Sequence, residues 1–284
     1  MDAIVSLEEL VAPLTEEEFL TLLRHRKLTL LRGTNADRYS KLLNWDALKR
    51  IIESGEYSFG EFRVTKEQAP VHPIFYLKDG ELDAAKIESL LTHGASIIIT
   101  HLEQSVPSLA ALCDNIKSRL PEKIKAGVIV TTGAGGALNL HYDTEDIIIL
   151  QVEGTKRWQI YSPAVANPVK DLPKQLPPKS APIFDEFLLP GDFLFVPGGN
   201  WHQCENGPGR SLHLGIFFAP PNGYFAVKAL TSQLLCEEMF RVPLTRLDSS
   251  SERAKLEANL IDRLNEKISQ LNLNEFVAEW NKKT

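Results

Sequence analysis

The hydrophobic pattern of the chain changes twice along its length. In residues 6–24, 44–54, 82–91 and 106–120, apolar side chains recur three or four positions apart, which predicts amphipathic helices. The first stretch carries two capping-box signals, Ser6 with Glu9 and Thr15 with Glu18. Short β-branched or alternating runs at 27–32, 57–64 and 95–100 predict strands between these helices.

From residue 127 the pattern becomes that of short strands separated by glycine and proline turns. We expect strands over 127–132, 139–143, 147–152, 156–161, 193–196, 201–204 and 211–218. Residues 163–182 hold six prolines and predict an irregular connection that could cover a site. Helical spacing returns at 224–239 and 250–271, and residues 274–280 add a short turn. This order predicts an α+β fold with a mainly β core, built as a sandwich or jelly-roll barrel.

Composition narrows the class of protein without deciding its function. The chain has 284 residues, of which 43% are hydrophobic, and a net charge of −6 with no basic patch. A nucleic acid is therefore not an expected partner, whereas a cationic substrate is compatible with the charge. Three scattered cysteines predict a reducing, cytoplasmic location without disulfides. We expect neither a secretory signal nor a membrane partner, because no segment approaches the roughly 18 apolar residues of a membrane span.

Polar residues interrupt the apolar strands in a pattern that could bind a metal ion. His141 and Asp143 lie two positions apart, and alternate residues of a strand point to the same face. Asn139 would share that face, and His202 lies on a later predicted strand. Two histidines and one carboxylate form the facial triad of non-heme Fe(II) oxygenases. Taken alone, a His-x-Asp pair is also typical of a polar surface strand. The glycines at 133, 135 and 136 do not indicate a phosphate-binding loop, because no Gly-Lys-Ser/Thr follows them.

Four sequence blocks arrive in an order that resembles a known family. They are His141-Tyr142-Asp143, Gln151-Val152-Glu153-Gly154-Thr155-Lys156-Arg157-Trp158, Leu189-Pro190-Gly191-Asp192, and His202. This arrangement resembles the JmjC/cupin oxygenases, and within them the bacterial cupin-4 proteins and ribosomal oxygenases. The resemblance implies a double-stranded β-helix in which His141, Asp143 and His202 are the catalytic Fe(II) ligands. It also implies that Lys156 binds the distal carboxylate of the cosubstrate 2-oxoglutarate, since a buried carboxylate needs a cationic partner.

Further cosubstrate contacts are less specific in the sequence. Thr131, Asn139 and Ser211 would point into the barrel near Lys156 or the metal, and Asn139 could equally cap a turn. Ribosomal oxygenases often carry a tyrosine where Ile129 stands, and this departure affects the remaining cosubstrate contacts. His213 could also point into the barrel, where we expect a supporting role rather than metal binding.

The predicted domains are an oxygenase domain over residues 1–221, with its barrel core at about 95–218, and a helical region over residues 222–284. Ribosomal oxygenases have a helical dimerisation region followed by a winged-helix domain. Residues 222–284 have room for a helical pair that could mediate a homodimer, but not for both modules. Hydroxylation of a ribosomal protein is correspondingly a weaker expectation.

The resemblance predicts a 2-oxoglutarate- and Fe(II)-dependent dioxygenase that hydroxylates a side chain of a protein or peptide. A hydroxylase of a small molecule or biosynthetic intermediate is an alternative, and a metal-binding cupin without turnover is another. Lys156 argues against the last of these, because a protein that only binds metal needs no cation for a cosubstrate. Lysine demethylation fits less well, since the resemblance lies with the hydroxylases. The sequence does not give the prime substrate, the hydroxylated position or the metal loaded in the cell.

Overall fold

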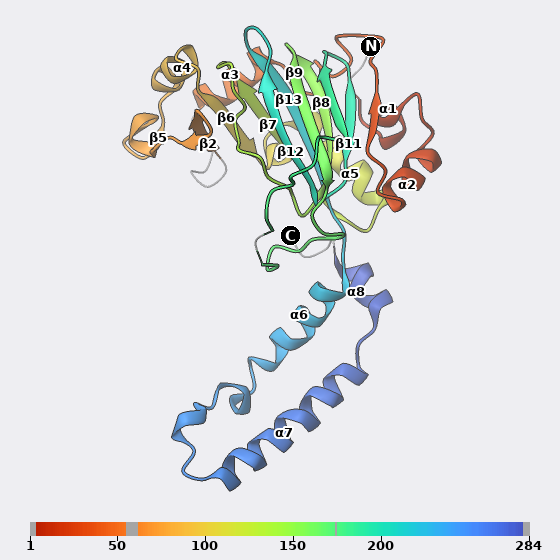
Figure 1. The fold of residues 1–284 in the computed structure, drawn as a ribbon, viewed down its shortest axis with the longest axis vertical. Helices are drawn as coiled ribbons and strands as arrows, with labels where there is room; N and C mark the ends of the chain where they lie inside the picture. The colour runs from red at the N-terminus through yellow and green to blue at the C-terminus, as the bar shows by residue number, and fades with distance from the viewer. Residues whose placement is uncertain (1–3, 55–61, 174, 281–284) are drawn as a thin grey trace. The chain divides into compact units, whose positions relative to one another are not determined.

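The chain divides into two compact units in a computed structural model that describes residues 4–54, 62–173 and 175–280 (Figure 1). The first unit is Met1–Ala219 and the second is Pro220–Thr284. No helix within these described ranges is both long and apolar enough to span a membrane. The assignment of the first unit as an oxygenase domain and of the second as a dimerisation element stays a prediction.

The first unit begins with two short helices where one helical stretch was predicted. They are α1 (Leu7–Val11) and α2 (Glu16–Arg24), and both predicted capping boxes are present. The interruption falls at Pro13, which cannot continue a helix hydrogen-bond ladder. Phe19 of α2 packs against the rings of Phe193, Phe195 and Phe218, at centroid distances of 5.7–6.3 Å. The two helices therefore cover part of the sheet.

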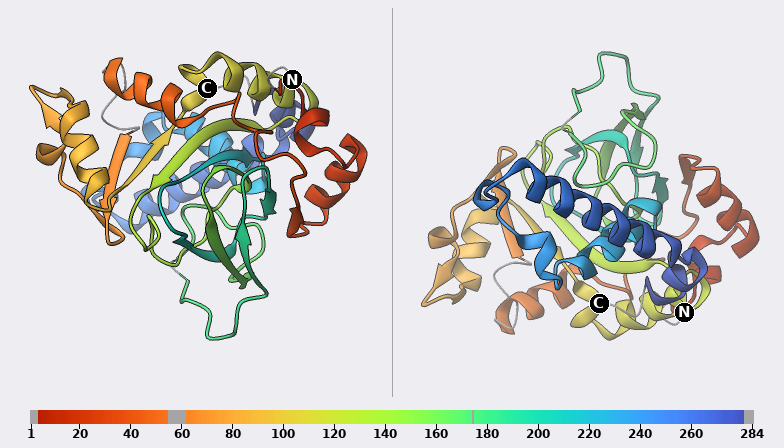
Figure 2. Two further views of the ribbon diagram at one scale, coloured as in Figure 1. Left: turned by 90° about the horizontal axis from the view of Figure 1, so that it is seen from above. Right: turned by 90° about the horizontal axis from the view of Figure 1, so that it is seen from below.

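A large, mainly antiparallel sheet forms the main layer of this unit. Its strands, in spatial order, are β1 (Thr29–Leu31), β11 (Phe193–Val196), β8 (Asp146–Glu153), β13 (Ser211–Ala219), β7 (Lys123–Thr131), β6 (Ser96–Thr100), β2 (Phe62–Lys66) and β3 (Ala69–Pro70). One face packs on α1, α2 and α5 (Pro107–Arg119), as the view from above shows (Figure 2). The predicted strand at 57–64 lies partly outside the described residues, and β2 runs on to Lys66.

A smaller sheet closes the other face of the large one. It consists of β10 (Phe184–Leu188), β9 (Lys156–Pro163) and β12 (Asn200–Asn206). Residues of β8 alternate between two cores, with Ile148 and Leu150 facing the helices and Ile147 and Ile149 facing the smaller sheet. This period of two is the strand pattern read from the sequence. The two facing sheets form the predicted jelly-roll barrel, and β10 was not predicted.

The remaining connections contain the other short elements. These are α3 (Trp45–Ser54), the hairpin β4 (Leu77–Lys78) and β5 (Glu81–Leu82), α4 (Ala84–Thr92), and the 3₁₀ turns η1 (Pro73–Phe75) and η2 (Leu102–Gln104). The proline-rich segment between β9 and β10 has no regular structure in its described part, as predicted, and it projects from the barrel (Figure 2).

The second unit is helical and has a sparse core. It contains α6 (Gly223–Leu234), the 3₁₀ turns η3 (Glu238–Arg241) and η4 (Leu244–Arg246), α7 (Ser250–Ser269) and α8 (Leu273–Trp280). The prediction that the first helix continues to residue 239 was wrong, because it ends at Leu234. Phe225 stacks on Trp280 at 5.1 Å, and Glu237 pairs with Arg263 at 2.7 Å. No residue of α7 is buried.

Candidate metal and cosubstrate site

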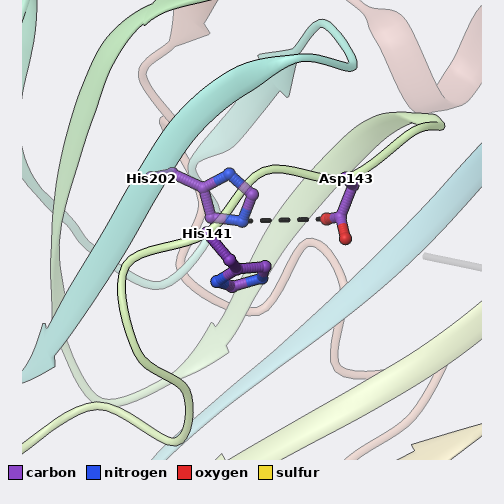
Figure 3. Close-up of side chains that lie close together, drawn as sticks. All are labelled: His141, Asp143 and His202. Atoms are coloured by element: carbon purple, nitrogen blue, oxygen red, sulfur yellow. Dashed lines mark ion pairs between the residues drawn. The ribbon is translucent and has the colours of Figure 1, made fainter. Parts of the chain in front are cut away.

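The structure brings the three predicted metal ligands together inside the barrel (Figure 3). One ligand atom from each of His141, Asp143 and His202 lies within 4.8 Å of the others. His202 Nε2 is 3.7 Å from Asp143 Oδ2, and the two imidazole rings are 4.4 Å apart. His202 is buried, whereas Asp143 is about one-third exposed, so the cluster is open on one side.

Backbone pairing between two distant segments sets this geometry. His141 forms an isolated antiparallel bridge with His202, through N–H···O bonds of 2.7 and 3.1 Å. The Nδ1 atom of each ring contacts a carbonyl oxygen two residues earlier, at 2.6 Å for His141 and 3.1 Å for His202. Such a contact orients the ring and leaves Nε2 free for a metal ion.

The prediction of a strand over 139–143 was wrong in detail. Only His141 makes a strand-like bridge, and the residues around it are irregular. Strand alternation therefore does not hold for Asn139, whose residue is exposed and whose carbonyl oxygen, rather than its side chain, contacts His141. The strand β12 pairs with this segment through His202 alone and forms no continuous ladder with it.

The surroundings of His202 and His213 disfavour protonation of these two side chains. Burial lowers the pKa of His202, although the nearby Asp143 carboxylate acts in the opposite direction. Burial and the nearby Lys156 ammonium lower the pKa of His213 well below its usual value. A neutral imidazole is the form that binds a metal ion. The electrostatics of the site therefore suit His202 as a ligand.

A pocket of about 200 Å³ adjoins the three ligands. This volume corresponds to about seven water molecules at ~30 Å³ each, enough for a small dicarboxylate or the end of one side chain. Its wall is mostly apolar and includes Ile98, Ile129, Trp158 and Phe217. Charged residues also line it, namely Arg63, Lys125 and Glu145. These three residues were not predicted from the sequence, because they belong to no motif and lie far apart along the chain.

Lys156 lies next to this pocket as a fully buried cation. Its Nζ donates to Thr131 Oγ1 at 3.0 Å and lies 3.5 Å from Nδ1 of the pocket residue His213. Ser96 Oγ in turn donates to Thr131 Oγ1 at 3.2 Å. Within the described part of the chain, no carboxylate lies within ion-pair distance of Lys156. Burial lowers the pKa of the ammonium, and a bound anion would have the opposite effect.

Ser211 is buried at the same end of the barrel but is held by a different neighbour. Its hydroxyl accepts a 2.9 Å hydrogen bond from Gln151 Nε2. The side-chain oxygen of Gln151 and the indole N–H of Trp158 are buried and have no hydrogen-bond partner among the described residues. Trp158 also lines the pocket, and its ring lies 5.7 Å from that of His202.

Part of the sequence also matches a family model. Residues 100–224 match the model of the JmjC domain. Over these residues the chain is similar to JmjC domains. The resemblance read from the sequence is thereby confirmed. A crystal structure of the ribosomal oxygenase YcfD from Escherichia coli has the same fold, with a TM-score of 0.57 and 18% identity, over 98% of this chain and 72% of YcfD. The predicted jelly-roll fold is confirmed by this likeness.

Relatives with similar sequences are longer proteins. Ribosomal oxygenase 2 of Mus musculus is 27% identical over 215 residues, which is 74% of this chain and 46% of the relative. A bifunctional lysine-specific demethylase and histidyl-hydroxylase of Drosophila willistoni is 34% identical over 131 residues, or 43% of this chain and 17% of the relative. The chain described here spans less than half the length of these relatives.

Proposed function

We propose that this JmjC protein is a 2-oxoglutarate- and Fe(II)-dependent dioxygenase that hydroxylates a side chain of a protein or peptide. The observation that carries the proposal is the combination of two sites in one barrel. His141, Asp143 and His202 converge beside a pocket, and the buried Lys156 lies next to that pocket without an acidic partner. A facial triad and a cation for the distal carboxylate are the two requirements of this chemistry.

The donor set fits a divalent iron ion. Two imidazole nitrogens and one carboxylate would occupy three positions of the metal, and the pocket lies on the open side of the cluster. The bound metal would supply oxygen activation coupled to decarboxylation of 2-oxoglutarate to succinate and CO₂. The ring contacts of both histidines with backbone carbonyls would orient the ligands, and the apolar pocket wall would limit access of water.

Lys156 and Thr131 would hold the distal carboxylate of the cosubstrate. The ammonium is already hydrogen-bonded to the Thr131 hydroxyl, so the two groups present adjacent donors. Asn139 and Ser211, named from the sequence as further cosubstrate contacts, are less suited to this role. Asn139 is exposed, and the hydroxyl of Ser211 is hydrogen-bonded to Gln151 rather than to Lys156.

A protein or peptide substrate is supported by the relatives. Two of them are named ribosomal oxygenase and histidyl-hydroxylase, and a structure of YcfD was solved in complex with cobalt and 2-oxoglutarate. The pocket beside the metal ligands has room for one substrate side chain, and its charged residues could contact the flanking backbone. Parallel assays with peptides and with free amino acids would separate this proposal from small-molecule hydroxylation.

Succinate formation by anaerobically iron-loaded protein, given 2-oxoglutarate and then O₂, tests the proposal. We expect slow turnover in the wild type without a prime substrate, and its loss in Lys156→Met. Lys125→Met is the matched control, because it removes another pocket lysine that pairs with Glu145 at 2.9 Å. 2-Oxoglutarate binding is measured by calorimetry on the same samples. A wild type that neither binds 2-oxoglutarate nor forms succinate would favour a cupin that only binds metal.

The second unit would pair two copies of the chain. Ile261 and Ile268 of α7 are 50% and 58% exposed, and their seven-residue spacing puts them on one face of the helix. A second copy would bury this face. Light scattering of the full chain should give a dimer for the wild type and a monomer for Ile261→Glu/Ile268→Glu. A cytoplasmic location belongs to the same proposal and is supported by three free cysteines.

A further inference from the structure

The turn Pro197-Gly198-Gly199 joins β11 to β12 and is hydrogen-bonded to the segment that carries Asp143. It leads directly into β12, which holds His202. The backbone N–H of Gly199 also donates to the carbonyl oxygen of Asp143 at 2.8 Å. A shift of this turn would therefore change the spacing between Asp143 and His202.

Two charged side chains hold the Gly198 peptide from both sides. Gly198 N–H donates to Asp146 Oδ1 at 2.7 Å, and the Arg26 guanidinium donates to the carbonyl oxygen of Gly198. Arg26 NH1 also lies 3.4 Å from Asp146 Oδ1. Asp146 is only 6% exposed, so its carboxylate has little access to water as an alternative partner. Arg26 follows α2, far from the other two residues in sequence.

Packing leaves this turn little freedom to move. A Cβ atom on Gly198 would lie 2.9 Å from the carbonyl oxygen of Glu145 and 3.0 Å from that of Thr144. Residues 144 and 145 are the link between the ligand Asp143 and the clamp residue Asp146. Gly198 thus contacts residues 144 and 145 directly, and these two residues join the metal ligand Asp143 to Asp146.

We propose that Asp146 and Arg26 are positioning residues that set the distance between Asp143 and His202, and thereby the affinity of the metal site. The inference rests on the proposed function, in which Asp143 and His202 bind the metal. Partners that orient metal ligands typically change metal affinity ~10–100-fold when they are lost. Asp146 and Arg26 touch no ligand side chain, and they act through the backbone of one turn.

A second buried aspartate provides a matched control. Asp192 is 2% exposed, pairs with Arg32 at 2.8 Å, and accepts backbone N–H bonds from Gly33 and Leu189. It holds the turn 189–192, which lies at the opposite end of β11 from the turn 197–199. Asp192→Asn therefore removes the same charge from a similar clamp that is not connected to the metal ligands.

Calorimetric titration with Mn(II) alone tests the inference on the full chain. We expect Asp146→Asn and Arg26→Lys to weaken Mn(II) binding by about 10-fold or more, and Asp192→Asn to leave it within about twofold. Arg26→Lys keeps the charge but loses the planar fork that reaches two acceptors, and it provides a second variant if Asp146→Asn does not fold. Uncoupled succinate formation should recover in the variants at saturating Fe(II) without Mn(II), because the defect lies in their affinity for the metal.

Two results would contradict different parts of the proposal. Equal Mn(II) affinities for Asp146→Asn, Arg26→Lys and Asp192→Asn would reject the positioning role, while leaving the metal site intact. A wild type that binds Mn(II) no better than His141→Ala would instead reject the proposed function. Melting temperatures of all variants are measured in parallel, since a purely structural role would lower stability without changing the Mn(II) affinity of the folded protein.

Discussion

The two ends of the barrel interior differ in the charge that they require. At the metal end, two imidazoles and the partly exposed Asp143 carboxylate converge, which gives a site suited to a cation. At the lysine end, Lys156 is fully buried and contacts only neutral partners, Thr131 and His213, which gives a site suited to an anion. A cosubstrate with a carboxylate at each end would satisfy both, with a metal dication at one end and an ammonium at the other. The arrangement of charge therefore favours a dicarboxylate over a neutral ligand.

Loss of a metal ligand should have the largest effect and should separate the two ends. We expect Asp143→Ala to weaken Mn(II) binding by more than about 100-fold, beyond the effect typical of outer partners, and to abolish succinate formation. Lys156→Met should leave Mn(II) binding within about twofold while abolishing 2-oxoglutarate binding, because the lysine contacts no metal ligand. Calorimetry with each ligand checks this. If Lys156→Met lost metal affinity as well, the two ends could not be treated as separate sites.

Asp192 should matter for stability rather than for metal binding. Its carboxylate is nearly buried and accepts bonds from Arg32, Gly33 and Leu189. Asp192→Ala leaves the backbone N–H groups of Gly33 and Leu189 without this acceptor, and we expect a loss of about 3 kcal/mol in the free energy of unfolding. Urea denaturation measures this loss. Arg32→Ala should cost less, because the arginine side chain is 48% exposed. Equal losses for both variants would mean that the ion pair, and not the turn, carries the stability.

The sequence predicted the two ends to different degrees. The metal end follows from three residues of the right chemical types, and the structure brings their ligand atoms within 4.8 Å of one another. The lysine end needed the resemblance, since nothing in the local sequence distinguishes Lys156 from a surface lysine. The clamp at Gly198 was not predicted, because Arg26, Asp146 and Gly198 come from three distant segments that only the tertiary fold brings together. Asn139 was misplaced for a related reason, since its neighbours leave the strand geometry on which alternation depends.

Glu122 gives the stability of the folded protein a pH dependence of its own. Its Oε2 atom is buried without a partner among the described residues, and burial together with the nearby Asp146 carboxylate raises the pKa of Glu122 to about 7. The folded state therefore binds a proton between about pH 4.5 and pH 7 that the unfolded state has released. The contribution of Glu122 to stability should fall as the pH rises through this window and stay constant above it.

Glu122→Gln should remove this dependence. We expect the variant to be more stable than the wild type at pH 8, by up to about 3 kcal/mol, and similar to it at pH 4.5. Denaturation curves at pH 4.5, 6 and 8 for both proteins measure the difference. Glu238→Gln is a suitable control, because that carboxylate lies in the second unit, on η3. A stability difference that does not vary with pH would mean that Glu122 is not protonated in the folded protein.

The smallest effect should come from Arg157, the residue next to Lys156. Strand alternation puts Arg157 on the outer face of β9, where it pairs with Asp185 at 2.7 Å and with Glu205 at 3.4 Å. Such exposed pairs are weak because water screens them and their side chains lose freedom. We expect Arg157→Ala to change the melting temperature by about 2 °C or less and to keep succinate formation at the wild-type rate. At high salt the shift in melting temperature should be smaller still, because the ions screen these pairs. A large loss of turnover in Arg157→Ala would show that the cosubstrate depends on charge at this hairpin in general. A loss confined to Lys156→Met shows that it depends on the ammonium group of Lys156.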